Sequence, residues 1–121
     1  MEFDVFARAC PSRSVLEHLT GRWGILALSA LETGPLRFNA LHRRVEGISQ
    51  KMLAQALQAL ERDGFVHREI RTVFPPHVEY SLTELGRETA AKLIDLIGHL
   101  EARMPAVLAA QRRHDHPGLS G

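Results

Sequence analysis

One face of a predicted helix between Ser49 and Gly64 collects side chains that donate hydrogen bonds, namely Lys51, Gln55, Gln58 and Arg62. At about 100° per residue these four positions fall on one stripe, opposite a stripe formed by Leu53, Leu57 and Leu60. Amide and ammonium groups on an exposed helix can bind base edges and phosphates of nucleic acid, whereas a merely solvated face would have the same composition. Ser49 is expected to cap this helix, with Gln50 in its first turn.

The elements around this helix indicate how it is presented. A shorter helix is expected over residues 38–45, and Gly47 marks a turn before the longer one. After Gly64 the hydrophobic period changes to two, because Val78, Tyr80 and Leu82 alternate with polar residues. The two strand-like runs are joined by Phe74-Pro75-Pro76, and they predict a hairpin. Helix, turn, helix and hairpin are the layout of a winged helix-turn-helix, whose second helix enters the DNA major groove beside the hairpin, or wing.

Further helices precede and follow this unit. Ser12 is expected to cap a first helix that ends at Gly21, and the nearly all-apolar stretch before Gly34 predicts a buried second helix. Thr83 is expected to cap a long last helix, which Pro105 either bends or divides.

The predicted fold class is therefore mainly α with a small β-hairpin wing, a winged helix-turn-helix with about five to six helices that dimerises through its terminal helices. We expect a single DNA-binding and dimerisation domain over residues 1–113 and a disordered tail over residues 114–121.

Composition excludes several other classes. No window approaches 18 consecutive apolar residues, and the acidic N-terminal segment does not resemble a signal peptide, so we expect a cytoplasmic protein. A single cysteine allows neither an intramolecular disulfide nor a four-cysteine zinc site. No glycine-rich phosphate loop is present, and no cofactor is expected.

An enzyme is not expected either. His18 with Ser12 or Ser14 lacks an orienting acid in the sequence, and no paired carboxylates emerge. His114 and His116 offer two metal ligands without a third, so we interpret them as ordinary tail residues.

The charge is unevenly distributed along the chain. The formal net charge is only +1, but residues 37–77 carry +3, whereas the segments before and after each carry −1. Because phosphate neutralisation supplies most non-specific affinity for DNA, the position of this excess is more informative than the sum.

Phosphate contacts are expected from both sides of the central helix. On or before the supporting helix the candidates are Arg37, Asn39, His42 and Arg43. On the wing they are Arg68, Arg71 and His77. Arg71 is nearest the tip and is the first choice, whereas Arg68 could instead pair with Glu69 or Glu79. Arg44 could face solvent or pair with Glu46.

Six motifs occur in one order: Cys10-Pro11, Gly21-Arg22-Trp23, Gly34-Pro35-Leu36-Arg37-Phe38 with Leu41, Gly47-Ile48-Ser49-Gln50-Lys51-Met52-Leu53, Leu60-Glu61-Arg62-Asp63-Gly64, and Pro75-Pro76-His77-Val78-Glu79-Tyr80-Ser81-Leu82-Thr83-Glu84-Leu85-Gly86. Over residues 10–100 the chain resembles the HxlR-type bacterial transcription regulators, relatives of the MarR-like proteins. The resemblance implies a homodimer on a pseudo-palindromic operator. It implies that the helix over residues 49–62 reads the major groove and the wing over residues 71–77 touches phosphates or the minor groove. It also implies an N-terminal cysteine that in some members senses electrophiles or oxidants.

Cys10 has two interpretations. A helix N-terminus and the neighbouring Arg8 and Arg13 would lower the pKa of its thiol and favour the reactive thiolate. The thiolate could then be capped by a small thiol or form a disulfide with Cys10 of the partner subunit. Alternatively, Cys10 is an inert, half-buried apolar residue.

The last helix carries more apolar width than one small domain can cover, which predicts a partner helix. The expected dimer interface comprises Phe3, Phe6, Leu93, Leu96, Ile97, Leu100, Met104 and Val107. The alternative is that these residues pack onto the core of their own chain.

Together these features predict a dimeric, sequence-specific DNA-binding repressor that responds to oxidants through Cys10 or to a small ligand at the dimer interface. Two alternatives stay open: a metal-responsive regulator that uses Cys10 and histidines, and a winged-helix protein-interaction module that does not bind DNA.

Overall fold

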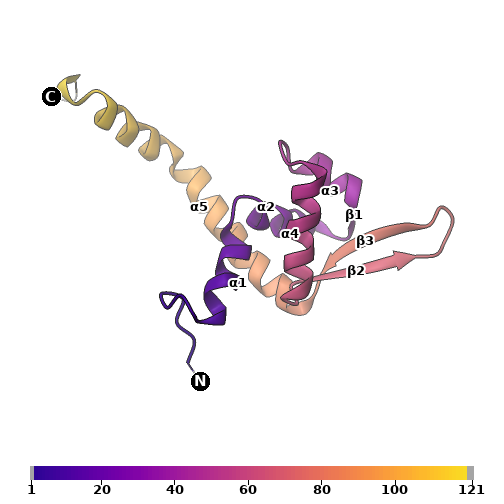
Figure 1. Cartoon of the computed structure of the whole chain (residues 1–121). Helices are drawn as coiled ribbons and strands as arrows, with labels where there is room; N and C mark the ends of the chain where they lie inside the picture. Colours follow the sequence, from indigo (N-terminus) through magenta and orange to yellow (C-terminus); the bar gives the residue numbers. More distant parts are fainter. Residues whose placement is uncertain (1, 120–121) are drawn as a thin grey trace.

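The computed structural model describes residues 2–119. Its helices are α1 (Pro11–Thr20), α2 (Gly24–Ala30), α3 (Phe38–Arg44), α4 (Gln50–Arg62) and α5 (Glu84–Asp115), with 3-10 turns at Leu31–Thr33 and Pro117–Leu119. Its strands are β1 (Leu36–Arg37), β2 (Val66–Arg71) and β3 (His77–Leu82). Figure 1 shows the β2–β3 hairpin projecting from one side of the helices and α5 extending away on the other. This arrangement confirms the predicted mainly α winged helix-turn-helix with its hairpin wing.

The sheet has one more strand than the sequence predicts. The order is β1-β3-β2 with both pairs antiparallel, and Leu36 of β1 lies opposite Tyr80. A two-residue strand after Pro35 is too short to show an alternating pattern, so only the hairpin could be predicted. In the hairpin, Tyr80 and Leu82 face the core as expected, and the tip exposes Phe74.

The core confirms the predicted spacing on α4. Leu53, Leu57 and Leu60 are at most 1% exposed, and they pack with Leu28 of α2 and Leu41 of α3. Burial of each leucine side chain stabilises the folded state by about 1.5–3 kcal/mol relative to leaving it exposed. These leucines therefore hold α4 against the other helices by one face and leave its polar face outward.

Hydrogen bonds fix the beginnings of α4 and α5. The Met52 N–H donates to Ser49 Oγ at 3.1 Å, and the Gly86 N–H donates to Thr83 Oγ1 at 2.9 Å, so both predicted caps are confirmed. Gly64 ends the α4 segment with a φ of +88°, a conformation that other residues rarely adopt. The Thr83 hydroxyl also donates to the Gly64 carbonyl at 2.6 Å, which ties the start of α5 to the end of α4.

The predicted cap of the first helix is wrong. Cys10 occupies the N-cap position of α1, and Pro11 is the first helical residue. Proline is common at the first position of a helix, because the N–H that it lacks would have no partner within the helix at this position. Ser12 therefore lies inside the first turn, where its hydroxyl contacts Cys10 Sγ at 3.2 Å.

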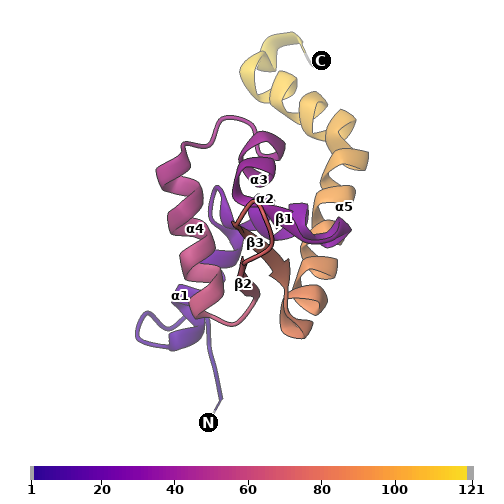
Figure 2. The ribbon, with the colours of Figure 1, turned by 90° about the vertical axis from the view of Figure 1, so that its right-hand side faces the viewer.

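The two apolar helices differ in part from expectation. In α2, Leu28 is fully buried, but Leu26 is 41% exposed, so this helix is not buried all round. The last helix is continuous through Pro105, which excludes a new helix at that residue, and Figure 2 shows it changing direction along its length. It ends at Asp115, two residues beyond the prediction.

A 3-10 turn follows within the predicted tail, whose residues 120 and 121 lie outside the described residues. Within residues 2–119, no helix has the length and apolar character needed to cross a membrane.

Candidate nucleic-acid interface

The polar face of α4 is open to solvent. Four predicted groove-facing residues on it are exposed, namely Gln50, Lys51, Gln55 and Gln58. None of their side chains makes a hydrogen bond or ion pair within residues 2–119. Their donors are therefore available to an external partner, while the leucines on the other face fix the helix in place. Arg62 is also exposed, with its Nη1 3.9 Å from Asp63 Oδ1.

The predicted phosphate contacts around α3 fall into two groups. Arg37, Asn39 and Arg43 are exposed and have no side-chain partner within the described part of the chain. His42 differs, because its Nε2–H donates to the Ile48 carbonyl at 2.8 Å and its ring stacks on Phe38. His42 thus holds the turn between α3 and α4.

On the wing, the structure reverses the expected roles of two arginines. Arg71 Nη2 lies 3.3 Å from Glu79 and 3.5 Å from Glu69, whereas Arg68 has no ion pair within residues 2–119. The register explains this pairing: Glu69 lies opposite Glu79, and Arg71 is two residues along the same face of β2. Of these two wing arginines, Arg71 is therefore the paired one, and Arg68 has no ion pair in the described part of the chain.

The other wing candidate is also engaged. His77 Nδ1–H donates to the Pro75 carbonyl at 3.0 Å, and Nε2 lies 3.5 Å from Glu79.

Because the ion pairs of Arg71 are exposed and therefore weak, Arg71 can still exchange Glu79 for a phosphate.

Comparisons with known proteins agree with this geometry. Residues 18–107 match the family described as HxlR-like helix-turn-helix. The chain belongs to this family. It is 53% identical to the HTH-type transcriptional regulator YtfH of Escherichia coli (strain K12) over 91% of this chain and 87% of that protein. These relationships make the chain a transcriptional regulator with a helix-turn-helix DNA-binding fold.

Two solved structures resemble most of this HxlR-like chain. The transcriptional regulator YtfH from Salmonella typhimurium superposes with a TM-score of 0.87 at 53% identity, covering 93% of this chain and all of that one. The redox regulator HypR in its oxidised form gives a TM-score of 0.70 at 38% identity, over 77% of this chain and 96% of that one.

Cys10 is half-buried at the start of α1. The pKa of its thiol is lowered, chiefly because the Ser12 side chain hydrogen-bonds to sulfur and next because the Asp4 N–H donates to it at 3.2 Å. This lowering of the pKa has the expected direction, and a hydrogen bond from the Ser12 backbone in the first turn of α1 also contributes, as expected for a helix N-terminus. The predicted contribution of Arg8 and Arg13 is not among its causes. The Arg13 guanidinium instead contacts the Val5 and Phe6 carbonyls at 3.4 Å each.

A contact that the sequence analysis missed joins α1 to α4. His18 Nδ1 lies 2.6 Å from Asp63 Oδ2, although the residues are 45 positions apart. Asp63 is thus the acid that His18 lacked in the sequence. Within the described residues, Ser14 Oγ donates to the Pro11 carbonyl and Ser12 contacts Cys10, and neither hydroxyl has a hydrogen bond to His18.

Four of the eight residues of the predicted dimer face are exposed. Leu96 and Leu100 on α5 are 53% and 49% exposed, and Phe6 is 89% exposed. Ile97, Met104 and Val107 are half-buried, and Phe3 is exposed. The prediction that Leu93 belongs to the dimer interface is wrong, because this residue is only 8% exposed and packs in the core of its own chain.

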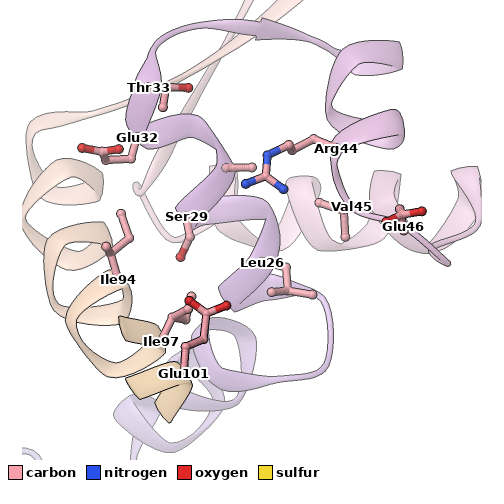
Figure 3. Close-up of a pocket in the computed structure, with 11 residues that line it drawn as sticks. Leu26, Ser29, Glu32, Thr33, Arg44, Val45, Glu46, Ile94, Ile97 and Glu101 are labelled. Atoms are coloured by element: carbon pink, nitrogen blue, oxygen red, sulfur yellow. The ribbon is translucent and has the colours of Figure 1, made fainter. Parts of the chain in front are cut away.

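A cavity of about 410 Å³ lies between α2, the end of α3 and α5. Figure 3 shows Arg44 reaching across from α3 and Glu101 approaching from α5, near Leu26 and Ile97. Ser29 also lines the cavity, and its buried Oγ has no hydrogen-bond partner among residues 2–119. Arg44 forms no ion pair with Glu46. The volume is within the range of small-molecule sites.

Proposed function

We propose that the protein is a cytoplasmic homodimer that binds a pseudo-palindromic operator, with α4 of each subunit in the major groove. The observation that carries this proposal is the exposed donor face of Lys51, Gln55 and Gln58, whose side chains have no partner within residues 2–119. Glutamine can pair with adenine through two hydrogen bonds, and lysine can reach guanine or a phosphate. A two-fold dimer would place two such helices about 34 Å apart, in successive major grooves.

Phosphate contacts would fix the register of the protein on the operator. The exposed cations without an ion pair within residues 2–119 include Arg37, Arg43 and Arg68, and Asn39 lies among them. Such contacts position a protein without reading sequence, and they make binding strongly dependent on salt. We propose repression because it needs only occupancy of the operator.

The dimer would use the exposed apolar face of α5 together with the N-terminal phenylalanines. Leu96, Leu100 and Phe6 are each about half exposed or more, which is costly for a chain that remains alone in water. A partner helix on this face would bury them and would fix the spacing between the two copies of α4.

The regulatory signal would be oxidation of Cys10. Hydrogen bonds from Ser12 and Asp4 favour the thiolate, which is the reactive form. Peroxide converts a thiolate to sulfenic acid and releases hydroxide, and condensation with a second thiol gives a disulfide and water. That second thiol would be a small thiol or Cys10 of the partner subunit. The relative HypR is named a redox regulator, which supports this proposal.

A small ligand is a second possible input, favoured by the cavity between α2, α3 and α5. Because Ile97 belongs both to the cavity lining and to the proposed dimer face, a bound ligand would favour one dimer geometry over another. The metal-responsive alternative has less support, since no three metal-binding side chains come together within residues 2–119.

Titration of a fluorescent random-sequence duplex with the protein, at several salt concentrations, tests DNA binding directly. A DNA-binding dimer gives a log K that falls linearly with log salt, with a slope of about −0.9 per neutralised phosphate. A protein-interaction module would show no such binding even at low salt, and that result would refute the proposal.

A further inference from the structure

Arg22 is an exposed cation that lies over an aromatic ring. It lies in the connection between α1 and α2, where its guanidinium carbon sits 4.8 Å from the centroid of the Trp23 ring. The side chain is exposed and makes no ion pair with any residue of the described range. Stacking on an aromatic ring limits the conformations of a guanidinium and leaves its hydrogen-bond donors free.

Trp23 places this cation next to the groove-facing helix. The Trp23 ring lies close to the turn between α3 and α4. A Cβ atom added to Gly47 in this turn would be 4.0 Å from Trp23 Cη2. Arg22 and Trp23 also line a shallow groove of about 240 Å³. Its opposite wall is a flank of α4 formed by Met52, Gln55, Ala56 and Ala59. Arg22 therefore borders the same helix that carries Gln55.

The wing borders the other side of α4. Figure 1 shows the α1–α2 connection on one side of α4 and the hairpin on the other. A helix that enters the major groove, which is about 12 Å wide, lies between two phosphate backbones. Arg68 on the wing would contact one of these backbones. The other backbone would lie along the flank of α4 that Arg22 borders.

We propose that Arg22 binds a DNA phosphate on the flank of α4 opposite the wing and that Trp23 positions it. This inference rests on the proposed DNA-binding function and adds a contact outside the basic segment 37–77. Arg22 belongs to a segment with a net charge of −1, so the charge distribution along the chain does not identify it as a phosphate contact. Its guanidinium can donate two parallel hydrogen bonds to one phosphate.

Arg22→Gln tests the contact with little change in shape, since glutamine keeps a planar polar end but loses the charge. Arg22→Lys keeps the charge and loses the planar fork. Arg113→Gln is the matched control, because it removes one positive charge at an exposed position near the end of α5. All four proteins are titrated with the same random-sequence duplex across a fourfold range of salt.

The wild type, Arg22→Lys and Arg113→Gln should share one salt slope. For Arg22→Gln the salt slope should be smaller in magnitude by about 0.9 for each subunit that engages a phosphate. The ratio of wild-type to variant affinity should therefore fall about threefold per lost contact when the salt concentration is raised fourfold. Thermal unfolding by circular dichroism verifies that each variant is folded.

Two results would overturn the inference, and they are distinguishable. If Arg22→Gln has the wild-type slope and only a lower melting temperature, Arg22 merely stabilises Trp23. If the wild type itself shows no salt-dependent binding, the proposed function fails, and the contact fails with it. Should Arg22→Gln not fold, Arg22→Glu with Arg113→Glu as its control gives the same comparison, with a larger expected loss of slope and affinity.

Discussion

A 2.6 Å hydrogen bond joins His18, in the last turn of α1, to Asp63, the residue that caps the C-terminus of α4. The Asp63 side chain is only 7% exposed, so the bond is largely shielded from water on that side. It directly connects α1 to the end of α4. A movement of α1 would therefore act on α4 through these two residues.

A double-mutant cycle with His18→Ala and Asp63→Ala measures this connection. Each single change should lower the free energy of unfolding by about 1–3 kcal/mol, because a hydrogen bond to a buried carboxylate is lost. The double mutant should fall short of the sum by at least about 0.5 kcal/mol. Urea unfolding provides the values, and Glu61→Ala on the exposed side of α4 should stay within about 0.5 kcal/mol of the wild type. Strict additivity would show that the two residues do not interact in solution.

Features set by neighbouring residues could be predicted from the sequence. The spacing of Leu53, Leu57 and Leu60 places them in the core, and Ser49 and Thr83 cap the helices that follow them. Alternation also predicts the hairpin. Each of these depends on a helical or strand period or on a residue within four positions, which is information that the local sequence contains.

Features that depend on distant contacts could not be predicted. The His18–Asp63 bond joins residues 45 positions apart, and the pairing of Arg71 with Glu79 follows from the strand register. Leu93 has the same helical pattern as Leu96, but α5 turns it into the core of its own chain. Sequence periodicity identifies an apolar face and does not tell which neighbour covers it.

Ser49 permits a test of whether the start of α4 faces DNA. Ser49→Ala should lower the free energy of unfolding by about 1 kcal/mol, because the Met52 N–H loses its acceptor. Ser49→Asp keeps an acceptor and suits a helix N-terminus, so its stability should be close to the wild type. Its added negative charge should nevertheless weaken DNA binding more than Ser49→Ala does. Equal affinities for Ser49→Asp and the wild type would place this end of α4 away from phosphates.

The thiol of Cys10 should react at lower pH than an ordinary thiol. Its pKa is lowered mainly by Ser12, since a hydrogen bond to the thiolate stabilises the charged form. The rate of alkylation by iodoacetamide, followed against pH, should rise at a midpoint below that of a free cysteine. Ser12→Ala should move this midpoint upward, whereas Ser14→Ala should not, because Ser14 donates to the Pro11 carbonyl. If Ser12→Ala leaves the midpoint in place, Ser12 does not stabilise the thiolate.

Lys51 and Gln55 should contribute to binding in different ways. Lys51→Ala should reduce the salt slope by about 0.9 per subunit if it meets a phosphate. Gln55→Ala should leave the slope unchanged and lose about 1–3 kcal/mol of discrimination between the operator and a site altered at the contacted base. Gel-shift titrations measure both effects, and sedimentation should show an intact dimer in each case. Unchanged affinity in both variants would contradict the assignment of α4 to the major groove.

Leu100 tests the dimer without disturbing the core, because it is 49% exposed in the isolated chain. Leu100→Glu should give a folded monomer, since each chain of a two-fold dimer loses a leucine contact and places a carboxylate in the interface. Burial of a leucine is worth about 1.5–3 kcal/mol, so the two changes together should weaken association at least about a hundredfold. Light scattering gives the mass, and operator affinity should fall because only one copy of α4 remains.

Ala102→Glu is the control for this change. Ala102 is exposed on α5 and lies on the side of the helix opposite Leu100 and Leu96 by its position in the helical repeat. The control should therefore remain a dimer and keep its operator affinity. If both variants remain dimers, the apolar face of α5 is not the interface. The exposed Leu96 and Leu100 would then require a different partner, and the spacing of the two α4 helices would have to be set by another part of the chain.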